Sequence, residues 1–343
     1  MKNDEIYNFI NPSSCDKLSD LKGKDLQRLI VLLSNHQLSL RDSLGLDKKI
    51  TYGLELEYEN IKNYYDKKIL DCIKDKLDKT GWISKYDSTL NCGVEINSPA
   101  LIDIKNSWLF LDDLLKFLKP YVEVGEKSGG HIHIGTQILG NNREGWLHFL
   151  ITWSIYENII YRFTSGDSIA ARNGVTEYAM PMMKDFYHYY TVLRNSNVKT
   201  ITSYLKATKR YQAVNFWNIK EDKLNDILYK NTIEFRSPNS SLNSVVWQNN
   251  VNLFTKFILY CASNNYDFET IEKRFWEYQH QYGNLDYYDE IFLDQALEFV
   301  DLIFNNNLDK LYFLKQYFKS FELKKENYGI RNIQKKKEIK FSL

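Results

Sequence analysis

The chain has 343 residues, a formal net charge of +1 and 43% hydrophobic residues, which is typical of one large or two modest globular domains. The near-neutral charge gives no reason to expect nucleic acid or an anionic membrane surface as the main partner. No apolar run reaches the roughly 18 residues of a membrane span, and the first residues lack a secretory signal pattern. The cysteines are scattered and form no CxxC motif: Cys15, Cys72, Cys92 and Cys261. These features exclude a disulfide-rich or zinc–thiolate protein and predict a cytoplasmic location.

Local patterns divide the chain into a helical start, a central part in which strands and helices alternate, and a mostly helical end. Residues 16–46 have a helical pattern, and we expect residues 1–48 to form an appendage that packs on the central part. Strands then alternate with helices as far as about residue 263. Residues 264–343 are mostly helical and end in a lysine-rich tail that we expect to be solvated. The clearest predicted helices cover residues 106–118, 145–163, 265–280 and 287–304.

Residues 50–59, ITYGLELEYE, have the alternating pattern of a half-buried strand. Successive side chains of a strand point to opposite faces, so Glu55, Glu57 and Glu59 share one face while the residues between them face a core. Neighbouring carboxylates about 7 Å apart repel each other by about 2 to 3 kcal/mol at an effective dielectric constant of about 20. The row therefore needs water, basic side chains or a metal ion to offset the repulsion.

Three later segments, CGVEINSP, GGHIHIG and TIEFRSP, repeat this arrangement of one apolar face and one polar face. Helical or loop segments separate most of the four predicted strands. This favours an α+β fold with an antiparallel or mixed sheet backed by helices. The polar-face residues of the three later segments are Glu95, Asn97, His131, His133, Glu234 and Arg236.

The four polar faces together use glutamate, histidine, asparagine and arginine but no lysine, whereas an ordinary solvated face mixes signs and includes lysine. Two interpretations stay open: four unrelated amphipathic strands, or one concave surface lined with metal ligands. In the second interpretation, carboxylates without thiolates suit two or three Mg²⁺ or Mn²⁺ ions, which accompany phosphate chemistry, better than a structural zinc. Two histidines at i and i+2 could instead hold a hydrolytic zinc. No P-loop or GxGxxG motif occurs, so metal ions and arginines would hold the phosphates.

The motifs GLELE, DSTLNCGVE, GGHIHIG, RYQAVN and TIEFRSP occur in this order between about residues 49 and 263. In order and spacing they resemble the amidoligase (carboxylate–amine ligase) families of the glutamine synthetase and glutamate–cysteine ligase superfamily. The resemblance implies a glutamine synthetase-like catalytic domain over residues 49–263, with a curved, mostly antiparallel sheet backed by helices. It also implies an ATP-dependent ligase that joins a carboxylate to an amine through an acyl phosphate at a site with several Mg²⁺ or Mn²⁺ ions.

The same resemblance implies which carboxylates and histidines bind metal ions. The ligands of one ion would be Glu57, Asp87 and Glu95. The ligands of a second ion, which bridges nucleotide phosphates, would be Glu55, His131 and Glu234. The catalytic residues would be Glu55, Glu234 and Arg236. Glu59 lies one step beyond the usual pair of glutamates and is given less weight.

Other implied contacts are to phosphate or substrate, for which arginine suits planar, bidentate binding. Arg236 would stabilise charge on the transferred phosphoryl group. His133 would face the phosphates or support the metal ligands, and Arg210 would contact phosphate or substrate. Weaker candidates for substrate contacts are Arg172, in a polar glycine-containing segment, and Asn215, just before the last predicted strand. A structural role is left open for Arg172, Arg210 and Asn215.

Two functions of other classes stay open beside the ligase. The first is a divalent-metal hydrolase of phosphoester or amide bonds, in which His131, His133 and the carboxylates activate a water molecule through the metal. The second is a non-catalytic Mg–ATP-binding assembly protein that kept the fold. The expected partners are ATP, a carboxylate and an amine, each a small molecule or a peptide, and assembly into a homo-oligomer is left open.

Overall fold

The computed structural model describes residues 17–35, 38–62, 67–167, 175–226, 231–277 and 292–318. Its named strands form one six-stranded sheet in the order β2-β3-β1-β4-β6-β5, and each neighbouring pair is antiparallel. The expected α+β fold, with an antiparallel sheet backed by helices, is confirmed. The strands are β1 (Tyr52–Tyr58), β2 (Ile83–Lys85), β3 (Val94–Asn97), β4 (Gly130–Gly135), β5 (Val214–Asn215) and β6 (Thr232–Phe235).

The register of the strands brings their polar residues onto one face. Glu55 of β1 lies opposite Asn97 of β3 on one side and opposite His131 of β4 on the other. His133 of β4 lies opposite Glu234 of β6. Directly opposed residues of antiparallel strands point to the same face, so these side chains come together although they are far apart in sequence. If one strand slipped by one residue against its neighbour, all its polar side chains would point toward the helices.

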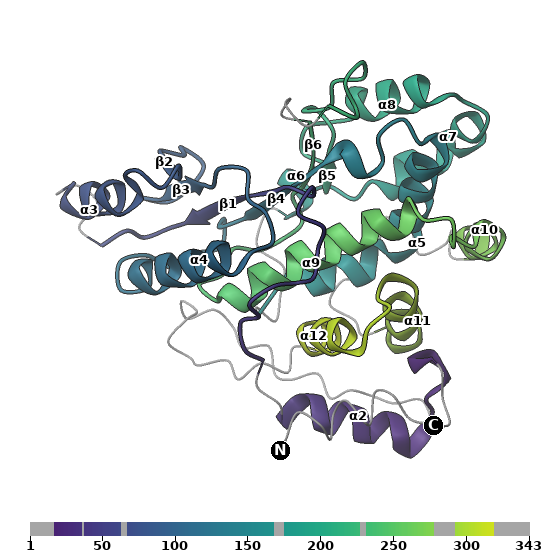
Figure 1. Cartoon of the computed structure of the whole chain (residues 1–343), viewed down its shortest axis with the longest axis horizontal. Helices are drawn as coiled ribbons and strands as arrows, with labels where there is room; N and C mark the ends of the chain where they lie inside the picture. The colour runs from purple at the N-terminus through teal and green to yellow at the C-terminus, as the bar shows by residue number, and fades with distance from the viewer. Residues whose placement is uncertain are drawn as a thin grey trace.

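Helices cover the apolar face of the sheet (Figure 1). The covering helices are α4 (Lys105–Leu118), α5 (Arg143–Thr164) and α9 (Ser244–Cys261). Phe235 of β6 stacks on Phe254 of α9 with ring centroids 3.9 Å apart. Tyr52 of β1 stacks on Trp108 of α4 with centroids 5.1 Å apart. These aromatic contacts bury the apolar face and leave the polar face of the central strands for other contacts.

A second helical layer packs below α5 and α9 in Figure 1 and consists of α11 (Leu293–Ile303) and α12 (Asn307–Tyr317). Because α5 and α9 contact the sheet on one side and this layer on the other, they are buried on nearly all sides. In the described ranges, no helix is both long and apolar enough to cross a membrane. The remaining helices are η1 (Leu18–Asp20), α2 (Gly23–Asn35), α3 (Lys68–Leu77), η3 (Thr136–Ile138), α6 (Val175–Tyr178), α7 (Met183–Arg194), α8 (Val198–Ala207) and α10 (Phe268–Glu277).

The predicted helices agree with the structure in the middle of the chain and differ near its start. The helices expected over 106–118 and 145–163 are α4 and α5, and those expected near the C-terminal end contain α10 and α11. The prediction of helix over 16–46 is wrong for residues 38–46, which form no helix. The carboxylate of Asp103 accepts hydrogen bonds from the backbone N–H groups of Leu44 and Leu46, and these bonds hold the segment in a non-helical path.

The N-terminal helices pack on helices from the C-terminal end of the described chain. η1 contacts α11, and α2 contacts α12. The backbone N–H and the hydroxyl of Ser19 donate to the carboxylate of Asp301, and Nζ of Lys315 donates to the carbonyl of Leu33. Arg41 forms a buried ion pair with Asp309, with Nη1 2.6 Å from Oδ1. The two ends of the described chain therefore stabilise each other.

Candidate active site

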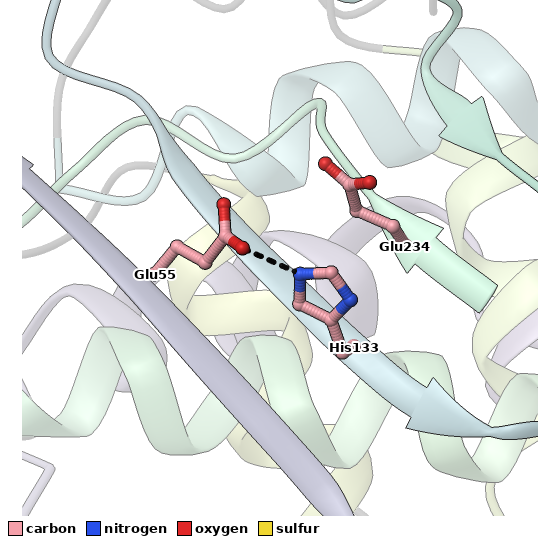
Figure 2. A group of neighbouring side chains, drawn as sticks. All are labelled: Glu55, His133 and Glu234. Carbon is pink, nitrogen blue, oxygen red and sulfur yellow. Dashed lines mark hydrogen bonds and ion pairs between the residues drawn. The ribbon is translucent and has the colours of Figure 1, made fainter. Parts of the chain in front are cut away.

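Three side chains from adjacent strands meet on the polar face: Glu55 of β1, His133 of β4 and Glu234 of β6. One ligand atom from each lies within 4.8 Å of the other two, and in the described part of the chain this is the one such group of three acidic, imidazole or thiol side chains. Nε2 of His133 donates to Oε1 of Glu55 over 3.0 Å. Figure 2 shows the two carboxylates approaching from either side of the imidazole. The cause is the strand order, because β4 lies between β1 and β6.

His131 lies two residues before His133 on β4 and is surrounded by carboxylates. Its Nδ1 donates to Oε2 of Glu55 over 2.7 Å and is 3.6 Å from Oε1 of Glu234. Its Nε2 is 3.6 Å from Oε1 of Glu57. The resemblance implied His131 as a metal ligand, and His133 as a residue that faces the phosphates or supports the metal ligands. In the structure, the three-residue group contains His133, and His131 fixes the orientation of Glu55.

The surrounding charges keep the carboxylates of the group ionised. Burial by itself raises the pKa of Glu55, but the hydrogen bonds from His131 and His133 outweigh burial and hold this pKa well below its ordinary value. Burial likewise opposes the ionisation of Glu234, and the positive charges of His131, Arg236 and His133 lower its pKa. Burial lowers the pKa of His133, but its hydrogen bond to Glu55 outweighs burial and raises this pKa. Ionised carboxylates are the form that binds a cation.

The second predicted set of metal ligands, Glu57, Asp87 and Glu95, is brought together only in part. Glu57 of β1 lies opposite Glu95 of β3. Oε2 of Glu57 accepts a hydrogen bond of 2.6 Å from the backbone N–H of Gly129. Asp87 lies in the loop after β2, and its Oδ1 accepts hydrogen bonds from the N–H and the hydroxyl of Thr89. The hydrogen bonds of Asp87 therefore stay within its own loop.

Glu95 is held by two neighbours on the same face, Asn97 and Lys85. Nδ2 of Asn97 donates to Oε1 of Glu95 over 2.6 Å, and Nζ of Lys85 is 3.7 Å from the same oxygen. Burial, with the negative charge of Glu55, raises the pKa of Glu95 against the effect of these two neighbours. Sequence reasoning missed Lys85, because the three-residue strand β2 is too short to show alternation.

Glu59, the last acid of the row, is fixed by backbone groups and is only 1% exposed. Its Oε1 accepts from the N–H of Asn91 and its Oε2 from the N–H of Lys127, both over 3.0 Å. A Cβ atom at Gly125 would lie 1.8 Å from Oε2, so the close approach of this loop requires glycine. The repulsion along the row is thus offset by backbone donors at Glu59 and by imidazoles at Glu55.

Arg236 lies beside Glu55, His133 and Glu234, which we call the central group, on the side of β6. Its Nη1 forms an ion pair with Oε1 of Glu234, and its Nε donates to the carbonyl of Tyr178 over 3.1 Å. Nδ2 of Asn215 on β5 donates to Oε2 of Glu234 over 2.7 Å. The structure thus brings Arg236 and Asn215 to the same carboxylate. Arg172 lies outside the described residues.

Arg210 lies in the turn before β5, among aromatic side chains. Its guanidinium carbon is 5.9 Å from the ring centroids of both Tyr211 and Trp217. Sequence reasoning did not single out these aromatic residues, since aromatic side chains are more often part of a core. Their signal was the RYQAVNFW stretch, in which they flank the β5 strand on both sides.

The donor set of the central group fits a hard divalent cation. Glu55 and Glu234 offer ionised oxygens, and His133 offers one imidazole nitrogen, a mixture that Mn²⁺ and Mg²⁺ accept. Oδ1 of Asn97, beside Glu55 in the sheet, is buried and has no hydrogen-bond partner in the described part of the chain. It is therefore a further oxygen available to such an ion or to its water.

A comparison with known families identifies the family of this chain. Residues 33–258, more than half of the chain, match the family model described as "Putative amidoligase enzyme". The matched region contains all the strands of the sheet and the residues of the central group, whereas η1 and α10 to α12 lie outside it. No curated protein matches the chain. The chain therefore belongs to the amidoligase family, as its motifs predicted.

Proposed function

We propose that this amidoligase is an ATP-dependent carboxylate–amine ligase that works through an acyl phosphate with two or three Mg²⁺ or Mn²⁺ ions. The observation that carries the proposal is the group of Glu55, His133 and Glu234 with Arg236 paired to it. This group brings two carboxylates and an imidazole, which would bind a metal ion, into direct contact with a guanidinium, which would bind phosphate. Enzymes of phosphoryl transfer need both kinds of group.

The chemistry explains why a ligase needs such a site. A carboxylate is a poor acyl donor, so one of its oxygens first takes the γ-phosphoryl group of ATP, and ADP leaves. The amine nitrogen then forms a bond to the acyl carbon, the bond from carbon to the phosphate oxygen breaks, and inorganic phosphate leaves. The proton that the amine loses passes to a base. Both anions must be held close together, which requires fixed positive charge.

The residues of the polar face supply these functions. Glu55, His133 and Glu234 would hold one divalent cation, and Glu57 and Glu95 would hold a further ion. When bound, the cations neutralise phosphate charge and orient the transferred group. Arg236, held by Glu234 and by the carbonyl of Tyr178, presents its guanidinium to the phosphoryl group. His131 keeps Glu55 in position through its hydrogen bond.

The direct test is the release of ADP in a matrix of carboxylates and amines with Mg²⁺ or Mn²⁺. We expect ADP and phosphate only where both substrates are present, together with a product that has the mass of the two substrates less one water. Cleavage of phosphoester or amide substrates without ATP would support the hydrolase instead. Binding of Mg–ATP without turnover over a broad matrix would support the non-catalytic assembly protein.

Matched variants connect any activity to the site. Glu234→Gln keeps the size of the side chain but removes a charge from the central group, and we expect it to abolish ADP release. Glu269→Gln makes the same change in the first turn of α10, outside the polar face, and we expect parental activity. Full activity of Glu234→Gln would contradict the assignment of Glu234 as a ligand of a required metal ion.

A further inference from the structure

Three aromatic side chains and one arginine form an exposed patch beside the central group. The aromatic–arginine patch consists of Tyr178 of α6 and of Arg210, Tyr211 and Trp217, which flank β5. Tyr178, Tyr211 and Trp217 are 40%, 43% and 50% exposed, although large aromatic rings are usually more deeply buried. The rings of Tyr178 and Tyr211 pack edge to face with centroids 5.6 Å apart. Exposed rings that contact each other in this way are typical of a binding surface.

The patch is connected to the central group through Arg236. The guanidinium carbon of Arg236 lies 5.8 Å from the ring centroid of Tyr211, and Nε of Arg236 donates to the carbonyl of Tyr178. The same guanidinium pairs with Glu234. The two arginines of this region therefore both lie against Tyr211, with Arg236 on the side of the central group.

Trp217 has a fixed orientation despite its exposure. Its indole N–H donates to the carbonyl of Thr208 over 3.1 Å, and its backbone N–H donates to Oδ1 of Asn215 over 3.0 Å. Asn215 in turn donates to Glu234. A ring that is held in place before binding loses little conformational entropy when a ligand stacks on it. Trp217 is therefore a preorganised stacking surface.

Arg210 forms no ion pair or hydrogen bond with an acidic side chain of the described residues. Its guanidinium carbon lies 5.9 Å from the ring centroids of both Tyr211 and Trp217. A ligand that fits this surface has a planar ring at one end and negative charge toward Arg236 and the central group. Nucleotides have this combination of a base and phosphates.

We infer that the aromatic–arginine patch binds the base of the nucleotide, with the ring stacked on Trp217 and the phosphates directed past Arg210 toward Arg236. The inference rests on the proposed function, because it assumes that the phosphates reach the central group. It adds the residues that recognise the base, and it assigns Trp217 and Tyr178 a role that no sequence motif indicated. Stacking would also explain why the patch is exposed while the chain has a well-filled core.

Calorimetry with two ligands tests this inference. The full chain and its variants are titrated with Mg–ATP and with Mg–tripolyphosphate, which has the phosphates but no base or ribose. Loss of one base–aromatic stack weakens nucleotide binding about 5-fold to 150-fold. We therefore expect Trp217→Ala to lose affinity for Mg–ATP by that factor and to bind Mg–tripolyphosphate within about twofold of the parent.

Two controls separate stacking from structural damage. Trp217→Phe loses the hydrogen bond to Thr208, as Trp217→Ala does, but it keeps a ring, and we expect it to retain most of the affinity for Mg–ATP. Trp276→Ala removes another exposed tryptophan, 41% accessible, from α10, outside the patch, and we expect parental binding of both ligands.

The outcomes distinguish this inference from the proposed function. If the parent protein binds neither ligand, the proposed function fails and the inference fails with it. If the parent binds Mg–ATP and Trp217→Ala binds it equally well, the base lies elsewhere and the proposed function stands. Equal losses for both ligands, or equal losses in Trp217→Ala and Trp217→Phe, would show a structural role and overturn the inference.

Discussion

Glu59→Gln tests which acids of the row Glu55, Glu57 and Glu59 have a structural role and which could bind a metal ion. The substitution keeps the size of the side chain but replaces one carboxylate oxygen by an NH₂ group. Both oxygens of Glu59 accept backbone N–H groups, from Asn91 and from Lys127, so the new NH₂ group faces a donor whichever way the amide turns. A lost hydrogen bond to a charged group costs about 1.5 to 3 kcal/mol, and an unpaired buried donor costs about 1 to 3 kcal/mol. These penalties overlap, and we expect a loss of about 2 to 4 kcal/mol in the free energy of unfolding.

Thermal melting followed by circular dichroism measures this loss. At about 1.4 °C per kcal/mol for a chain of this size, the melting temperature should fall by about 3 to 6 °C, while ATP turnover at low temperature remains. Glu55→Gln is the matched change four residues earlier, within β1. Its hydrogen bonds involve His131 and His133, and an imidazole nitrogen can accept a hydrogen bond from the new NH₂ group as well as donate one, so we expect near-parental melting and no turnover. Unchanged melting of Glu59→Gln, or normal turnover by Glu55→Gln, would refute this division of roles.

Two further predictions concern the packing of the helices. Arg41→Ala leaves Asp309 buried without its ion pair and should lower the free energy of unfolding, measured in urea, by about 3 kcal/mol. The ion pair of Lys22 with Asp294 is exposed, so Lys22→Ala should change this free energy by less than about 1 kcal/mol. Equal effects of the two substitutions would contradict the reasoning. Burial lowers the pKa of His148, so the unfolded chain takes up a proton near pH 6.5 before the folded one does, and stability falls as the pH drops below that value. The difference in urea midpoint between pH 7.5 and pH 5.5 should therefore be smaller in His148→Gln than in the parent, and an unchanged difference would contradict this.

Alternation along the chain was enough to predict the polar face. Residues two apart in a strand must share a face, so the grouping of Glu55 with Glu57, and of His131 with His133, follows from sequence alone. The helices predicted over residues 106–118 and 145–163 likewise lie close to the observed α4 and α5. The order of five short motifs was enough to predict the amidoligase family that the family match confirms.

Periodicity could not predict which side chains of that face would meet. It assigns a face but not the pairing of strands, and the pairing of β4 with β6 places His133 directly opposite Glu234, with His131 3.6 Å from the same carboxylate. The carboxylate of Asp87 accepts hydrogen bonds from Thr89 in its own loop, and the carboxylate of Glu59 accepts them from the backbone N–H groups of Asn91 and Lys127.

The sequence by itself determined the family, the α+β class and the polar face of the strands, because strand and helix periods and motif order are local properties of the chain. Only the tertiary structure decided which acids come together with His133 and which are bound by backbone N–H groups. It also decided that the N-terminal helices pack on the C-terminal ones and that the aromatic–arginine patch lies beside Arg236. These features depend on contacts between segments far apart in sequence, and the burial and charge of each side chain are set by the partners that those contacts bring.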